Sequence, residues 1–159
     1  MLDQTWTDFE LIVVDDGSRD STVNIVEGLA AEDSRVVLLK NAQNEGVASS
    51  RNRGVASAHG EWIAFLDSDD LWRKDKLEKQ IAYLSQFPDA AIGYTASAFM
   101  DAEGIRYSYV MPAVPKTTYA MLMRGNLMSC SSVMVKTEWI RKYPMGAGNM
   151  HEDYAAWLQ

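Results

Sequence analysis

The sequence is poor in cysteine and in long apolar runs. Cys130 is its single cysteine, so an intramolecular disulfide is excluded and a zinc site built on thiolates is disfavoured. The longest apolar runs, such as LIVV at 11–14, are far shorter than the roughly 20 residues that cross a bilayer. No signal-peptide pattern opens the chain. These absences predict a soluble, cytoplasmic protein.

Basic residues are also scarce. Fifteen Lys and Arg stand against 22 Asp and Glu, which gives a net charge of -7. Nucleic-acid binding requires a basic footprint, so no nucleic-acid partner is expected. An acidic protein that binds a nucleotide diphosphate must neutralise it locally, with a metal ion or a well-placed arginine.

Apolar runs alternate with helical patterns in the first half of the chain. We expect strands at 9–14, 36–39 and 62–66, and helices after Ser21, at about 46–58 and at about 74–86. This alternation predicts an α/β fold, with a mostly parallel sheet and helices on both faces.

The second half changes to a mixed α+β pattern after Pro88. Two strand-like runs flank the turn DAEG and predict a β-hairpin between 90 and 110. The remaining expected elements are a helix near 117–124, a strand at 131–136, a short helix from Thr137, a loop at 144–151 and a final helix that begins with Glu152 and Asp153.

Two acidic groups follow expected strands. Asp15 and Asp16 follow the first, and Asp67, Asp69 and Asp70 follow the third. Ligands of open α/β sheets bind outside the carboxyl ends of the strands, so both groups are expected to face one crevice.

The spacing of Asp67 and Asp69 is compatible with a metal site. If strand geometry persists, their side chains point the same way with Cα atoms roughly 6–7 Å apart. That arrangement suits Mg²⁺ or Mn²⁺ shared with phosphate oxygens. The plain alternative is an acidic surface turn or helix cap. An EF-hand fits less well, because Leu71 and Trp72 occupy positions that its loop fills with a ligand and glycine.

The other polar candidates also have two interpretations. Asp15 and Asp16 either form an ordinary turn or accept hydrogen bonds from a base or ribose. Arg51 could contact a nucleotide, whereas Arg53 is the better candidate for a solvent-facing residue.

Glu152 and Asp153 open the final helix. They either stabilise the helix dipole or provide a general base for an acceptor hydroxyl. Asp153 is the preferred base, with Glu152 in support.

Four segments resemble the family 2 glycosyltransferases in order and spacing: TDFELIVVDDGSRDST, NEGVASSRNRG, EWIAFLDSDDLW and HEDYAAWLQ. The resemblance implies a Rossmann-like GT-A fold, a UDP-sugar or other nucleotide-sugar donor, a divalent metal and inversion at the anomeric carbon. It also implies a saccharide or lipid-linked acceptor in cell-envelope or exopolysaccharide synthesis, at the inner face of the membrane.

The resemblance also assigns roles to the acidic residues and Arg51. Asp15 and Asp16 would hold the base and ribose, with Arg51 near the nucleotide. Asp67 would lie nearer the ribose and Asp70 close to the donor sugar.

Metal binding and catalysis are assigned in the same way. Asp69 would be the principal metal ligand, with Asp67 as the second. Asp153 would match the catalytic base, supported by Glu152.

Family members usually open with a strand and a helix before the segment DQTW. The resemblance therefore implies that residues 1–159 are a fragment of one catalytic domain, truncated at both ends. Residues 1–88 would bind the donor and 89–159 would lie on the acceptor side. A missing inner strand would leave unpaired edges, so a homodimer through an exposed edge is expected.

Two other functions remain open. The first is a nucleotide-sugar-binding module without turnover. The second is a receiver-like signalling domain that binds Mg²⁺ around a phosphoacceptor Asp. The hairpin between 90 and 110 and the remote Glu152 and Asp153 argue against the receiver.

Overall fold

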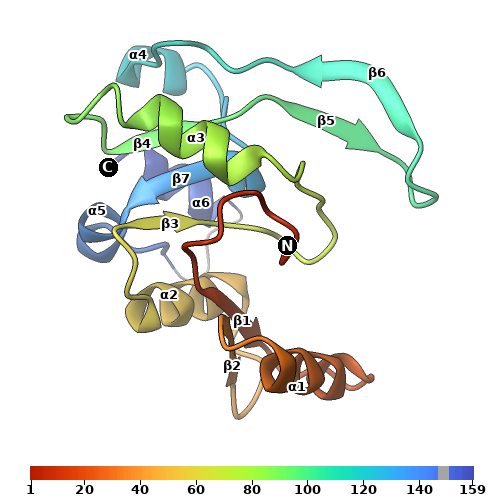
Figure 1. Cartoon of the computed structure of the whole chain (residues 1–159). Helices are drawn as coiled ribbons and strands as arrows, with labels where there is room; N and C mark the ends of the chain where they lie inside the picture. Colours follow the sequence, from red (N-terminus) through yellow and green to blue (C-terminus); the bar gives the residue numbers. More distant parts are fainter. Residues whose placement is uncertain (147–150) are drawn as a thin grey trace.

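A computed structural model of the chain describes residues 1–146 and 151–159 (Figure 1). Strands and helices alternate in the first half, close to the predicted positions. The elements are β1 Leu11–Asp15, α1 Thr22–Glu32, β2 Val36–Lys40, α2 Val47–Ser57, β3 Trp62–Ala64 and α3 Lys76–Leu84.

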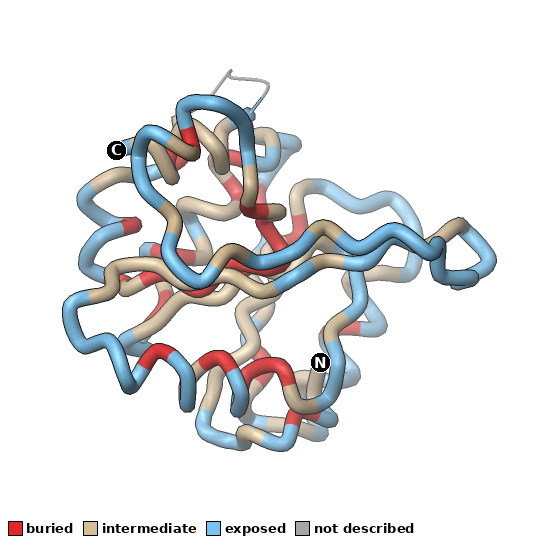
Figure 2. Tube along the Cα trace, turned by 90° about the horizontal axis from the view of Figure 1, so that it is seen from above, coloured by how far each residue is buried: buried red, intermediate tan, exposed pale blue. Residues whose placement is uncertain are grey.

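The second half contains short strands and helices. They are β4 Ile92–Tyr94, β5 Ser97–Met100, β6 Arg106–Met111, α4 Tyr119–Leu122, the 3-10 helix η1 Cys130–Ser132, β7 Val133–Lys136, α5 Thr137–Lys142 and α6 Glu152–Trp157. The predicted hairpin is β5–β6, which extends away from the body and is largely exposed (Figures 1 and 2). The predicted loop at 144–151 lies partly outside the described residues.

The strand pairing differs from the mostly parallel sheet that the alternation predicts. β1 pairs in parallel with β2, Leu11 opposite Val36. β7 lies between β3 and β4 and is antiparallel to both. In the described part of the chain, β1 and β3 therefore belong to separate sheets. The α/β class is as predicted, but the sheet order depends on a late strand, β7, that returns against β3.

α2 packs closely on β1 because its contact face carries small residues. A Cβ added at Gly54 would lie 3.4 Å from Cγ2 of Val14, at the short limit of ordinary van der Waals contact. α3 approaches β4 in a similar way, since a Cβ at Gly93 would lie 2.6 Å from Cδ2 of Leu84. A larger residue at Gly93 would require the Leu84 side chain to move out of its present position.

Two apolar clusters hold these layers together. One surrounds the fully buried Val133 and includes Phe65 and Ile140, while the other joins Leu77 to Met134. Each buried side chain of this kind contributes about 1.5–3 kcal/mol. The clusters fix β3, β7 and α3 relative to one another, and so fix the loop that carries the second acidic group.

Candidate functional site

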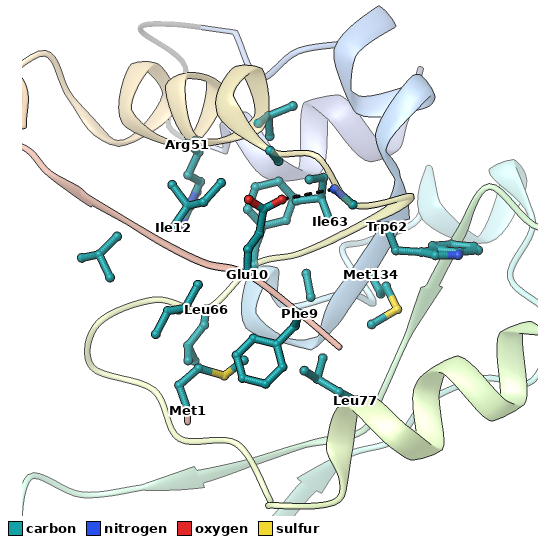
Figure 3. Close-up of a pocket in the computed structure, with 18 of the residues that line it drawn as sticks. Met1, Phe9, Glu10, Ile12, Arg51, Trp62, Ile63, Leu66, Leu77 and Met134 are labelled. Atoms are coloured by element: carbon teal, nitrogen blue, oxygen red, sulfur yellow. Dashed lines mark hydrogen bonds between the residues drawn. The ribbon is translucent and has the colours of Figure 1, made fainter. Parts of the chain in front are cut away.

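A cavity of about 1840 Å³ lies between β1 and β3 (Figure 3). α2 contributes to one of its walls and α3 to the opposite wall. Five residues predicted from the sequence line it: Asp16, Arg51, Asp67, Asp69 and Asp70. Strand ends distant in sequence therefore share one crevice, as predicted.

Asp16 is held by three hydrogen bonds. Its Oδ1 accepts from Nδ2 of Asn41 at 2.7 Å and from the Glu45 amide at 2.8 Å, and its Oδ2 accepts from the Gly46 amide at 2.9 Å. These donors, Asn41 first, hold the pKa of Asp16 below its ordinary value of 3.8. The carboxylate thus orders the loop that leads into α2.

Asp15 has a different environment. It is buried and accepts hydrogen bonds from the amides of Gly17 at 3.2 Å and Ser18 at 3.3 Å. Gly17 has a φ of 89°, which glycine adopts readily. Asp15 is not among the residues that line the cavity. Its contacts favour the turn-forming interpretation, and a nucleotide contact by Asp15 stays a prediction.

Arg51 joins three elements. From α2 its Nη2 donates to Oδ1 of Asp67 at 2.5 Å, and its Nη1 donates to Oε1 of Glu152 at 2.8 Å. The exposed fractions of the Arg51 and Glu152 side chains are 15% and 14%. Burial opposes the positive charge, but the hydrogen bond to Asp67 and the attraction of both carboxylates outweigh it and raise the pKa of Arg51. The single positive charge of Arg51 thus offsets part of the negative charge of the two carboxylates and holds both in place.

The segment after β3 is a turn and not a continued strand. β3 ends at Ala64, and the Asp70 amide donates to the Asp67 carbonyl at 3.1 Å. The assumption that Asp67 and Asp69 follow strand alternation is therefore wrong. The Asp67 amide donates to Oγ of Ser131 at 3.0 Å, and this hydrogen bond anchors the start of the turn.

The acidic turn fits a divalent ion only in part. Among the described residues, no three His, Cys, Asp or Glu side chains come together as a ready-made metal cluster. Asp67 is engaged by Arg51, whereas Asp69 is exposed at the cavity. Mg²⁺ commonly uses one or two carboxylates together with substrate phosphates. Asp69 suits an ion whose other ligands come from a diphosphate.

Glu152 and Asp153 lie in the first turn of α6, as predicted. Neither lines the cavity, but Arg51 connects Glu152 to it. Oδ1 of Asp153 accepts from the Tyr154 amide at 2.7 Å. Contacts deeper in α6 hold the helix in position: the Tyr154 hydroxyl donates to the Leu122 carbonyl, and Trp157 packs on Phe65 at 6.0 Å between ring centroids.

The buried thiol of Cys130 is influenced by the charged residues of the acidic turn and of α6. Its pKa is raised to about 12, by burial first, and the negative charges of Asp67, Asp153 and Glu152 add to the shift while Arg51 opposes it. Cys130 itself is buried, with its thiol protonated at neutral pH.

Sequence reasoning missed two supporting residues. Asn41 follows β2 and donates to both Asp16 and Oγ of Ser50, the latter at 2.9 Å. Its position at a strand end was the available signal. Ser131 fixes the acidic turn, and its carbonyl accepts from Nε1 of Trp72 at 2.7 Å. Ser131 has no local signal, because its partners lie 59 and 64 residues away.

No helix in the described ranges 1–146 and 151–159 is both long and apolar enough to span a bilayer.

The family model and the similar proteins of known sequence agree on one family. Residues 1–141 match glycosyl transferase family 2. TuaG of Bacillus subtilis (strain 168), a glycosyltransferase named for teichuronic acid biosynthesis, is 33% identical over 99% of this chain and 62% of its own length. WfgD of Escherichia coli, named as a UDP-Glc:alpha-D-GlcNAc-diphosphoundecaprenol beta-1,3-glucosyltransferase, is 35% identical over 99% of this chain and 60% of its own. The chain thus spans about three fifths of these relatives.

Two solved structures share the fold. S. aureus TarS 1-349 in complex with UDP has a TM-score of 0.76 at 23% identity, over 96% of this chain and 47% of that one. The mannosyltransferase PcManGT from Pyrobaculum calidifontis, in complex with GDP-Man and Mn²⁺, has a TM-score of 0.66 at 20% identity, over 97% and 44%. At these identities the likeness establishes the GT-A fold alone.

Proposed function

Because the chain belongs to glycosyl transferase family 2, we propose that it carries the donor-binding part of an enzyme that transfers a sugar from a nucleotide diphosphate to an acceptor hydroxyl with inversion. One observation carries this proposal. Arg51 ties the acidic turn after β3 to the acidic start of α6, beside a cavity that Asp16 and Asp69 also line. Residues 1–88 would then bind the donor, and 89–159 would form the acceptor side.

The donor would occupy the acidic mouth of the cavity. Asp16 would lie at the base or ribose, Asp67 near the ribose and Asp70 near the sugar. A net charge of -7 makes local neutralisation necessary for a diphosphate. Asp69, with Asp67 as a second carboxylate, would hold Mg²⁺ or Mn²⁺, and that ion would supply Lewis-acid stabilisation of the departing diphosphate. The Mn²⁺ and UDP complexes of proteins with this fold support the choice of ligands.

Asp153 would act as the general base. It would accept the proton of the acceptor hydroxyl while that oxygen bonds to the anomeric carbon. The bond from carbon to the phosphate oxygen breaks on the opposite face, and the diphosphate leaves with the electron pair. Glu152 forms an ion pair with Arg51. Asp153 forms no ion pair within the described residues and accepts one hydrogen bond from the Tyr154 amide, so it is the better placed of the two carboxylates to accept a proton. Glu152 would then position α6 and Asp153 with it.

The acceptor would be a saccharide or a lipid-linked saccharide of the cell envelope. Support comes from the names of the relatives, which specify teichuronic acid and diphosphoundecaprenol. An acceptor on a polyprenyl carrier would bring the protein to the inner face of the membrane as a peripheral, cytoplasmic enzyme.

A binding module without turnover is the second candidate. It is favoured by the ion pairs of Arg51, which already engage Asp67 and Glu152. Both candidates predict binding of a nucleotide diphosphate, and they differ only in turnover.

Calorimetric titration with UDP, with and without Mn²⁺, tests the shared prediction. Release of UDP from UDP-glucose then separates the candidates. For the enzyme, Asp153→Asn should lower turnover by about 10²–10⁴-fold and leave UDP affinity unchanged. Glu103→Gln, at the distant hairpin tip, is the matched control and should change neither quantity. Binding by the wild type without any turnover would select the binding module, and no UDP binding would reject both candidates.

A further inference from the structure

The acidic turn of residues 67–70 is held near both of its ends by one buried residue, Ser131. At the start of the turn, the Asp67 amide donates to Oγ of Ser131 at 3.0 Å. Just beyond its end, Nε1 of Trp72 donates to the Ser131 carbonyl at 2.7 Å. The position of the turn therefore depends on where the Trp72 indole is held.

Lys76, the first residue of α3, places its ammonium group over the Trp72 ring. Its Nζ lies 4.1 Å from the ring centroid, and the side chain is buried. A cation is attracted to the negative face of an aromatic ring, and the attraction is stronger when the cation is desolvated. The contact therefore favours the ring orientation in which Nε1 of Trp72 reaches the Ser131 carbonyl.

Gln80 connects Lys76 back to the same segment of the chain. Its Oε1 accepts from Nζ of Lys76 at 2.7 Å, and its Nε2 donates to the carbonyls of Gly93 and Ser132, each at 3.1 Å. Ser132 directly follows Ser131, so the contacts form a closed ring that runs from Ser131 through the indole, the ammonium group and the amide. A buried polar network whose members all have partners is rigid.

A lysine at this buried position is costly for the stability of the fold. Burial lowers the pKa of Lys76 to about 8, so the side chain is still mostly protonated at neutral pH. No carboxylate in residues 1–146 or 151–159 forms an ion pair with it. An apolar side chain of similar length would avoid the cost of burying a charge. A buried ionisable group beside a cavity is a candidate for a functional role.

We propose that Lys76 is a positioning residue of the donor site, which holds the acidic turn in place through the Trp72 ring and Ser131. This role rests on the proposed function, in which Asp67 and Asp69 of the turn hold a divalent ion together with a diphosphate. An ion shared between protein and phosphate needs its ligands within a narrow range of positions. A less ordered turn should therefore weaken metal-assisted binding of UDP and leave metal-free binding almost unchanged.

Calorimetric titration with UDP at pH 7, with and without Mn²⁺, tests the role on the wild type, Lys76→Met, Trp72→Phe and the double variant. Methionine keeps an unbranched side chain without the charge, and phenylalanine keeps a ring without the N–H that reaches Ser131. Each single change should reduce the Mn²⁺-dependent gain in UDP affinity by about threefold to tenfold. The double variant should lose about as much as the larger single effect, because both changes interrupt one chain of contacts.

Two further measurements separate positioning from a merely structural role. Lys76→Met removes a buried charge, so its free energy of unfolding at pH 7 should equal or exceed that of the wild type. Hydrogen exchange at the Trp72 indole N–H, followed by NMR, should nevertheless be about tenfold faster in this variant. Lys79→Met is the matched control, because Lys79 is an exposed lysine of the same helix, and it should leave both the exchange and the Mn²⁺-dependent gain unchanged.

A full Mn²⁺-dependent gain in Lys76→Met would overturn the proposal, as would single effects that multiply in the double variant. So would an unfolding free energy of Lys76→Met below that of the wild type, since lost stability would then explain the weaker binding. In each of these cases the gain seen in the wild type leaves the proposed function standing. A wild type without any Mn²⁺-dependent gain would instead reject the metal-assisted donor site and the role of Lys76 with it.

Discussion

Arg51 donates to Glu152 across 2.8 Å, although the two residues lie 101 positions apart in the chain. The same guanidinium binds Asp67, so one side chain couples α2, the acidic turn and α6. A planar guanidinium can bridge two carboxylates in this way, whereas a lysine ammonium offers no such fork. The arrangement of the proposed catalytic residues therefore depends on Arg51.

Replacing Arg51 should destabilise the fold. Arg51→Gln leaves the Glu152 carboxylate largely buried without its cation, and we expect a loss of about 2–3 kcal/mol in the free energy of unfolding. Urea unfolding measures it. Arg73→Gln is the matched control, because that guanidinium pairs with Asp75 while 80% exposed and should matter little. Equal stability of the two variants would mean that the Arg51 bridge contributes nothing.

Asp16 should give the fold an acid-dependent stability. Its pKa lies below 3.8 in the folded chain, so its hydrogen bonds contribute fully above that value. The contribution is lost as the pH falls below 3.8 and the carboxylate is protonated in the folded state. Asp16→Asn removes this titration, so the stability difference from the wild type should shrink between pH 4 and acid unfolding.

Urea midpoints measured in parallel on the two proteins give that difference. Asp33, whose pKa is lowered to about 2 by Arg35, titrates in both proteins, so its contribution cancels from the stability difference. A difference that stays constant as the pH falls would contradict the assigned role of Asp16.

Asp69 should carry the metal dependence of nucleotide binding. In the wild type, Mn²⁺ should raise UDP affinity, because the ion shares its ligands between carboxylate and diphosphate. Asp69→Asn should reduce that gain by about tenfold or more, while UDP affinity without metal changes little. Calorimetric titration measures both values. If Glu103→Gln lost the metal effect equally, the assignment to Asp69 would be wrong.

Lys76 should make stability increase at alkaline pH. It is buried, its Nζ donates to Gln80 at 2.7 Å and lies 4.1 Å from the Trp72 ring centroid, and burial lowers its pKa to about 8. The unfolded chain keeps the ordinary value of 10.5, so between pH 8 and 10.5 the unfolded state binds more protons and stability rises with pH. The rise is about 3 kcal/mol at most.

The measurement compares the wild type with Lys76→Met. The stability of the wild type relative to the variant should increase through that pH window, and Lys79→Met, an exposed change in the same helix, should show no such trend. Burial raises the pKa of Cys130 from 9.0 to about 12, so this thiol lowers the stability of the fold as the pH rises above 9. The effect is the same in the wild type and in both variants and therefore cancels from the stability differences. A flat difference between wild type and Lys76→Met would contradict the prediction.

The elements of this fold follow from local sequence patterns, and their pairing does not. The apolar run before Asp15 predicts β1, and the spacing of Leu77, Ile81 and Leu84 predicts α3, because periodicity is a property of neighbouring residues. Pairing of β7 with β3 joins residues about 70 positions apart, such as Ile63 and Val135. No local pattern encodes such a contact.

In the candidate site, too, the residues could be predicted from the sequence and their contacts could not. Asp16, Arg51 and Asp69 were predictable as residues at strand ends and on the neighbouring helix, and they share one cavity. The ion pair of Arg51 with Glu152 and the turn at Asp67 depend on tertiary contacts and were not predictable. The roles of all these residues in donor binding and catalysis stay proposals.

The central claim is that the acidic mouth of the cavity holds a nucleotide diphosphate through a divalent ion at Asp69. A crystal structure of the chain with UDP and Mn²⁺ tests it most directly, because anomalous scattering locates manganese unambiguously. We predict an anomalous peak at coordination distance from the Asp69 carboxylate and the diphosphate, with the uridine beside Asp16. Manganese bound elsewhere, or UDP on another surface, would contradict the account.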